Sequence, residues 1–197
     1  MTGKDGVVLI AHKPSPSKLI VLESLRKVFE IDDHVAIVAT GLVADARRLI
    51  DMARVEAPRY RYTYNEPADI EYIARHLADL MQLYTQYGGA RPYGVSLIFG
   101  GVDSRPRVFE ADPSGTLIGS HATVVGAGKN EVSEYLEKHY TENLGTDQLI
   151  ALGFAAMKQV PDMKLKQEIF EVALIHTKTK TYEQLSGDKI SEYKSKA

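Results

Sequence analysis

The stretch YTQYGGARPYGVSLIFGGVD, residues 84–103, changes from a helical to a strand-like pattern within twenty residues. Its first residues end a helical pattern, and Val95–Phe99 then form an apolar, strand-like run that Gly100-Gly101 closes. The joint between helix and strand contains Gly88-Gly89 followed by Arg91-Pro92. A tight turn would account for the glycines alone, so the arginine and the proline require a more specific explanation.

Outward from this joint, short apolar runs alternate with amphipathic helical patterns in a grouped order. The runs that predict strands are Gly6–Ala11, Val28–Ile31, His34–Ala39, Val95–Phe99, Arg107–Ala111, Thr116–Ile118, Ala122–Val125, Phe170–Ile175 and Lys180–Tyr182. A loop over Pro14–Ser17 separates the first two runs.

The helical patterns come in pairs between these groups of strands. One begins after Gly41 and is expected to end at Pro58, and the next is expected to take Asn65 as its N-cap and Pro67 in its first turn. Two more run over Lys129–His139 and from Thr146, and Ser186 could cap a short last helix. The order predicts an α+β fold in which two antiparallel sheets lie face to face, with a helix pair on each outer face.

Composition sets the broad class of the protein. The 197 residues suit one domain over residues 1–197, with 44% apolar and 25% charged residues and a net charge of −2. This balance argues against a dedicated nucleic-acid surface. The chain contains no cysteine, which excludes disulfides and thiolate zinc sites and fits a reducing compartment. No apolar run approaches the ~20 residues that span a bilayer.

Four features could carry chemistry, and each has an ordinary alternative. The glycine-rich Gly126–Lys129 could bind an anion but lacks the spacing of a phosphate loop, so a turn into a helix is the simpler interpretation. The run Arg59–Tyr62 could be a nucleic-acid platform, or a solvated helix end or subunit contact. Thr2, if exposed as an N-terminal residue, could act as a nucleophile with its own amine as base. The six histidines form no local metal motif.

Several stretches together resemble one known family. They are residues 31–34 (IDDH), 40–47 (TGLVADAR), 84–97 (YTQYGGARPYGVSL), 109–115 (FEADPSG) and 126–129 (GAGK). In this order and spacing they are similar to α-type subunits of the 20S proteasome, most of all to the archaeal form, and the resemblance covers nearly the whole chain. It implies a four-layer αββα sandwich of the N-terminal nucleophile hydrolase fold.

The resemblance also explains the joint from which we started. It implies that Tyr87, Gly88, Gly89, Ala90 and Arg91 line the pore annulus of a heptameric ring, through which unfolded protein enters. It further implies that Lys27, Gly41 and Leu42 form the pocket that binds the C-terminal tail of an AAA ATPase activator. The partners implied are other α subunits and a proteolytic β ring. The resemblance implies no cofactor, metal, nucleic acid or membrane, and a location in the cytoplasm.

Two departures from the family pattern bear on catalysis. Only Met1 to Lys4 precede the turn at Asp5-Gly6, so we expect a member without the family's gating segment, first helix and first strand. Lys27 coincides with the catalytic lysine of active relatives, but His12 stands where they keep an acidic residue. We therefore expect no catalytic residue and no peptidase activity. The alternative is an N-terminal nucleophile hydrolase that uses Thr2.

Overall fold

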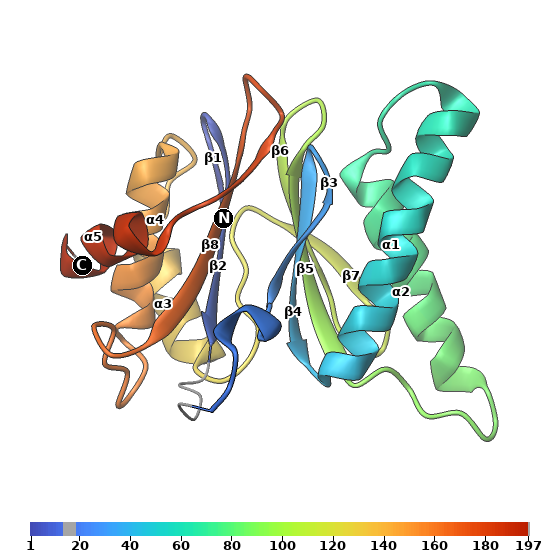
Figure 1. Ribbon diagram of the computed structural model, residues 1–197, viewed down its shortest axis with the longest axis horizontal. Coiled ribbons are helices and arrows are strands. Elements are labelled where there is room, and N and C mark those ends of the chain that lie inside the picture. Colours follow the sequence, from blue (N-terminus) through green and yellow to red (C-terminus); the bar gives the residue numbers. More distant parts are fainter. Residues whose placement is uncertain (14–18, 197) are drawn as a thin grey trace.

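The computed structural model describes residues 1–13 and 19–196, which fold into four layers (Figure 1). Two antiparallel sheets lie face to face, with two helices on the outer face of one sheet and three on the outer face of the other. The predicted α+β sandwich is therefore confirmed. The loop predicted over Pro14–Ser17 lies outside the described residues.

The first sheet has the strand order β1-β2-β8-β9, and the second has the order β3-β4-β5-β6-β7. In the first sheet the strands are β1 Thr2–Gly3, β2 Gly6–Lys13, β8 Ile169–His176 and β9 Tyr182–Gln184. In the second they are β3 Val28–Asp32, β4 Val35–Gly41, β5 Val95–Val102, β6 Pro106–Ala111 and β7 Leu117–Ser120. The helices are α1 Val43–Tyr64, α2 Ile70–Gln86, α3 Lys129–His139, α4 Thr146–Met157 and α5 Gly187–Lys196, and a 3₁₀ turn covers Leu22–Ser24.

The apolar run in β5 shows how the layers are held together. Leu97 and Phe99 face α1 and α2, whereas Ile98 faces the first sheet. Because side chains alternate between the two faces of a strand, a strand buried on both faces needs apolar residues at every position. The same logic explains the apolar run of β2, where Val8 packs under α4 and Val7 and Leu9 lie between the sheets.

The first long helix differs from the prediction at both Pro58 and Asn65. Pro58 lies inside α1, which continues to Tyr64, so the expectation that Pro58 ends the helix was wrong. A proline removes one helical hydrogen bond, but beyond it the ring of Tyr60 packs on that of Tyr72 of α2, with 4.6 Å between centroids. Asn65 caps the C-terminus of α1 in the left-handed region, and Asp69 rather than Asn65 precedes α2.

Two short segments also differ from the sequence predictions. Residues 122–125 form no strand; Ala122 and Val124 are half-buried by contact with α3 instead of by strand pairing. At the N-terminus the expectation of no strand before Gly6 was wrong, since the two-residue β1 pairs antiparallel with the start of β2. Among the described residues, no helix combines the length and the apolar character that a bilayer crossing requires.

Candidate functional site

Lys27 lies at the entrance to β3, where hydrogen bonds fix its backbone from two sides. The amide of Ala39 donates to the carbonyl of Lys27 (3.0 Å). The amides of Lys27 and Val28 both donate to Oε2 of Glu171, at 2.8 and 2.9 Å. The side chain is half-buried, and burial lowers the pKa of the Lys27 ammonium group, an effect that the charge of Glu171 partly offsets.

Glu171 is itself held by a buried ion pair. Its Oε1 lies 2.6 Å from Nζ of Lys13, and the two side chains are only 6% and 8% exposed. One carboxylate oxygen thus pairs with a buried cation while the other accepts two amides, so the group is paired and hydrogen-bonded as a buried charge must be. The position of the Lys27 backbone therefore depends on this pair.

Gly41 and Leu42 lie at the same end of the sandwich, just past Ala39 on β4. Gly41 has a φ of +120°, and a Cβ there would lie 2.3 Å from the carbonyl oxygen of Gly94, so only glycine fits. The amide of Leu42 donates to that same oxygen at 2.8 Å. Leu42 is 51% exposed and is the residue that precedes α1. The structure thus brings the three predicted pocket residues to one end of β3 and β4.

The predicted pore loop, Tyr87–Arg91, leaves the end of α2 and returns along the same end of the molecule to β5 (Figure 1). All five of its residues are exposed. Gly89 has a φ of +85°, and a Cβ added at Gly88 or Gly89 would meet nothing within 4 Å. Crowding within the chain therefore does not require a glycine at position 88. At position 89 the left-handed backbone conformation favours glycine.

An ion pair fastens this loop to α1. Arg91 donates from Nη1 and Nη2 to the two carboxylate oxygens of Asp45, at 2.6 and 2.8 Å. The amide of Gly94 donates to Oδ2 of Asp45 at 2.8 Å. The hydrogen bonds from Arg91 and then from Gly94 hold the pKa of the Asp45 carboxyl below its ordinary range.

A cavity of about 310 Å³ opens beside Lys27, between the two sheets and under α3 and α4. Its lining is mostly apolar, and Lys27, Thr40 and His12 contribute polar groups. His12 forms a 2.8 Å contact through Nε2 with Glu168. The cavity can accommodate an apolar group beside an ammonium group.

Thr2 does not join this site. Its hydroxyl lies 3.1 Å from the carbonyl oxygen of His121 and 3.0 Å from the hydroxyl of Tyr140. Thr2 pairs with Val7, four residues of β2 before the position opposite Glu171, which is roughly 13 Å along the strand. Thr2 and the backbone of Lys27, which bonds to Glu171, thus lie at different levels of the sandwich.

The remaining candidates are engaged within the fold. Lys129 pairs through Nζ with Glu110 at 2.9 Å, so its charge already has a partner at the start of α3. Arg61, from the predicted basic and aromatic run, pairs with Asp32 at 2.7 Å. In the described part of the chain, no group of three or more His, Asp or Glu side chains could hold a metal ion.

Two residues of this site were not singled out from the sequence. Glu171 lies inside an apolar strand pattern, where an isolated glutamate was a usable signal because buried carboxylates need partners. Asp45 looked like an ordinary charge on an exposed helix face, and its partner Arg91 is 46 residues away in the chain. Only the return of the loop to α1 reveals the pair.

Comparison with protein families matches residues 1–175 to the family described as "Proteasome subunit". The chain belongs to this family of proteasome subunits. The family resemblance inferred from the sequence is therefore confirmed, and the sandwich described above is consistent with it.

Individual relatives of this proteasome subunit cover almost all of its length. "Proteasome subunit alpha" of Archaeoglobus fulgidus is 42% identical over 194 residues, 98% of this chain and 79% of the relative. The protein of the same name from Picrophilus torridus is 46% identical over 191 residues, 96% of this chain and 81% of the relative. That of Methanocaldococcus jannaschii is 44% identical over 190 residues, 96% and 72% respectively.

Proposed function

We propose that this chain is a non-catalytic α-type subunit of the 20S proteasome core. Copies of it form a heptameric outer ring on a ring of β subunits, in the cytoplasm. The loop Tyr87–Arg91 lines the entrance for unfolded protein, and Lys27, Gly41 and Leu42 receive the tail of an AAA ATPase activator. The names of the relatives, which are α subunits, support the assignment to the α type.

One observation carries this proposal: the loop and the three pocket residues lie at one end of the sandwich, where the loop, Gly41 and Leu42 meet at Gly94. Its carbonyl accepts the amide of Leu42, and its own amide donates to Asp45, which holds Arg91. An activator that docks on one face of the particle can act on both the entrance and the docking pocket only if both lie on that face. Their common end satisfies this requirement.

The chemistry at Lys27 fits a terminal carboxylate. A half-buried ammonium attracts an anion more strongly than a fully exposed one, because less water screens the pair. Leu42, exposed at the same end of the sandwich, offers an apolar contact. A peptide tail that ends in a free carboxylate and carries apolar side chains matches both.

The surroundings of Thr2 support a non-catalytic role. Its hydroxyl is engaged with Tyr140 and His121, and the residue is only 8% exposed. Nucleophilic attack requires a base in hydrogen-bond reach of the hydroxyl, and burial raises the pKa of Tyr140, which keeps that neighbour protonated. Thr2→Ala should therefore leave the peptidase activity of an assembled particle unchanged.

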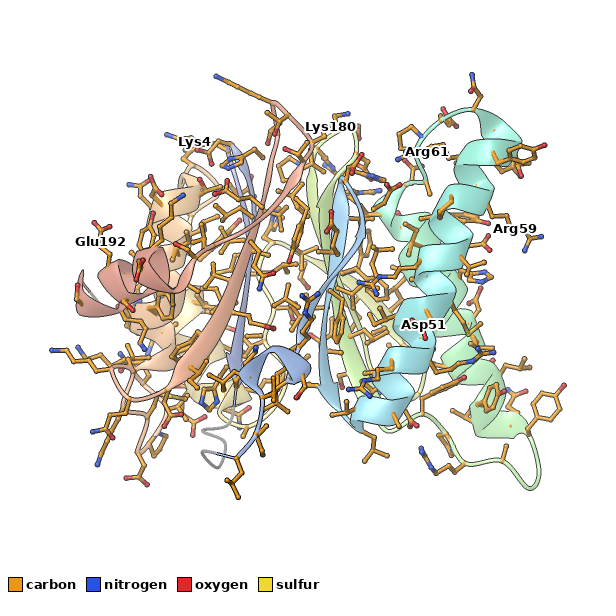
Figure 2. All side chains as sticks on the ribbon, viewed as in Figure 1. Lys4, Asp51, Arg59, Arg61, Lys180 and Glu192 are labelled. Atoms are coloured by element: carbon orange, nitrogen blue, oxygen red, sulfur yellow. The ribbon has the colours of Figure 1, made fainter. Side chains whose placement is uncertain are left out.

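The proposal is tested with particles assembled from this chain and a β subunit of the same organism. We expect an AAA ATPase to stimulate degradation of an unfolded protein by these particles, and Lys27→Ala to remove most of the stimulation. Lys4→Ala is the matched control, because Lys4 is exposed and lies on the turn at the opposite end of β2 (Figure 2). Equal stimulation of the Lys27 and Lys4 variants would contradict the pocket assignment.

A further inference from the structure

Arg91 connects the loop to the body of the protein through its charged side chain. Other contacts of Tyr87–Arg91 are local: the amide of Ala90 donates to the carbonyl of Tyr87, Arg91 donates to the carbonyl of Pro92, and the ring of Tyr87 lies against that of Tyr84. We propose that Asp45 is the positioning residue of this loop and joins it mechanically to the docking residues Gly41 and Leu42. The contact between Asp45 and the loop stands on the geometry alone, whereas its effect on activator-stimulated degradation rests on the proposed function.

The geometry of the joint is specific to an aspartate facing an arginine. The two parallel bonds from Arg91 fix the plane of the guanidinium against the plane of the carboxylate, which a lysine could not do. Nη1 of Arg91 also donates to the carbonyl oxygen of Pro92 at 3.0 Å, so the same side chain holds the exit of its own loop. The Asp45 side chain is 12% exposed, whereas that of Arg91 is 62% exposed.

Asp45 is well placed to keep its charge. It lies in the first turn of α1, where free backbone amides and the helix dipole favour an anion. Its carboxylate also accepts the Gly94 amide, so three hydrogen bonds converge on it. At neutral pH the group is therefore ionised and the joint is closed.

The joint reaches the docking residues through the backbone of Gly94. The amide and the carbonyl of this one residue bond to Asp45 and to Leu42, three positions apart at the start of α1. Gly41 has no space to move toward Gly94, because a Cα hydrogen of Gly41 already faces the Gly94 carbonyl. A displacement of Leu42 by a docked tail is therefore transmitted to Gly94 and, through Asp45, to Arg91. The entrance loop and the pocket move as one unit.

The first test measures the order of the loop in the purified chain, by amide hydrogen exchange over residues 84–93. Asp45→Asn removes the charge that holds Arg91, and we expect about tenfold faster exchange in the loop, the order of one lost charge-assisted hydrogen bond. Arg91→Lys should fall between wild type and Asp45→Asn. The control is Asp51→Asn, the same charge change at an exposed position of α1, and it should leave the loop unchanged. Unaltered exchange in Asp45→Asn overturns the inference.

The second test separates positioning from docking in the assembled particle. We expect Asp45→Asn to bind an activator-tail peptide within about twofold of wild type, but to lose severalfold in stimulated degradation of an unfolded protein. Full stimulation overturns the coupling. If wild-type particles show no stimulation, the proposed function fails, whereas the hydrogen exchange of the chain alone still decides whether Asp45 holds the loop.

Discussion

The buried pair Lys13–Glu171 offers the sharpest test of how the backbone of Lys27, the proposed docking residue, is held. Glu171→Gln keeps the shape of the side chain and an oxygen that can accept the amides of Lys27 and Val28. It removes the charge that faces Lys13 at 2.6 Å. Because Lys13 is itself buried, this substitution leaves a buried cation without its partner.

Loss of one member of a buried ion pair costs about 3–5 kcal/mol. For a chain of this length, each kcal/mol shifts the midpoint of thermal unfolding by roughly 2–4 °C, so we expect a fall of roughly 6–20 °C. The assay is thermal unfolding at pH 7 followed by circular dichroism. The control is Glu183→Gln, which breaks the exposed pair with Lys189 (60% and 44% exposed) and should change the free energy of unfolding by less than about 1 kcal/mol.

A second substitution tests whether the unpaired charge of Lys13 causes the loss of stability in Glu171→Gln. Lys13→Met combined with Glu171→Gln removes both charges, so we expect the double variant to be more stable than Glu171→Gln alone. The reasoning would be refuted by a Glu171→Gln variant that loses less than about 1 kcal/mol. It would also be refuted by a double variant that loses the sum of the two single losses.

Three further predictions concern other parts of the same end and the helix beside it. Gly41→Ala should lower the free energy of unfolding by at least about 1–3 kcal/mol, because φ is positive and the Cβ would meet a carbonyl oxygen, whereas Gly88→Ala, in open space, should be nearly neutral in the same denaturant titration. Because burial lowers the pKa of Lys27, binding of a carboxylate tail should weaken as the pH rises through that pKa, at a pH below the 10.5 of an ordinary lysine. In Lys27→Arg the charge persists, so calorimetry should show no such loss of binding. Parallel pH profiles for the two proteins would contradict the assignment. Pro58→Ala should stabilise the chain by about 1–3 kcal/mol, since it restores a helical hydrogen bond at an exposed position, and a loss of stability would show that the proline is needed for packing.

Much of the fold follows from local patterns in the sequence. The bounds of α3 were predicted without error, because a glycine-rich turn precedes Lys129 and the apolar residues recur at helical spacing. The two sheets followed from apolar runs long enough for one strand each. These signals are local, so a single sequence is enough to detect them.

The errors arise where contacts distant in the sequence override a local rule. Pro58 breaks a helix by itself, but packing of the tyrosines beyond it keeps α1 helical. The run at residues 122–125 has the composition of a strand, yet Ala122 and Val124 pack against α3 and not in a sheet. At the candidate site the resemblance supplied the predicted residues, and their roles remain a proposal. The charged residues that hold them, Asp45 and Glu171, depend on chain segments that meet only in the folded protein.

We predict that this chain assembles, as a structural subunit, with proteolytic partners. The most direct test is native mass spectrometry of the chain mixed with the β-type proteasome subunit of the same organism. We predict a complex that contains several copies of both chains. A chain that remains monomeric in the presence of β subunits would contradict the account.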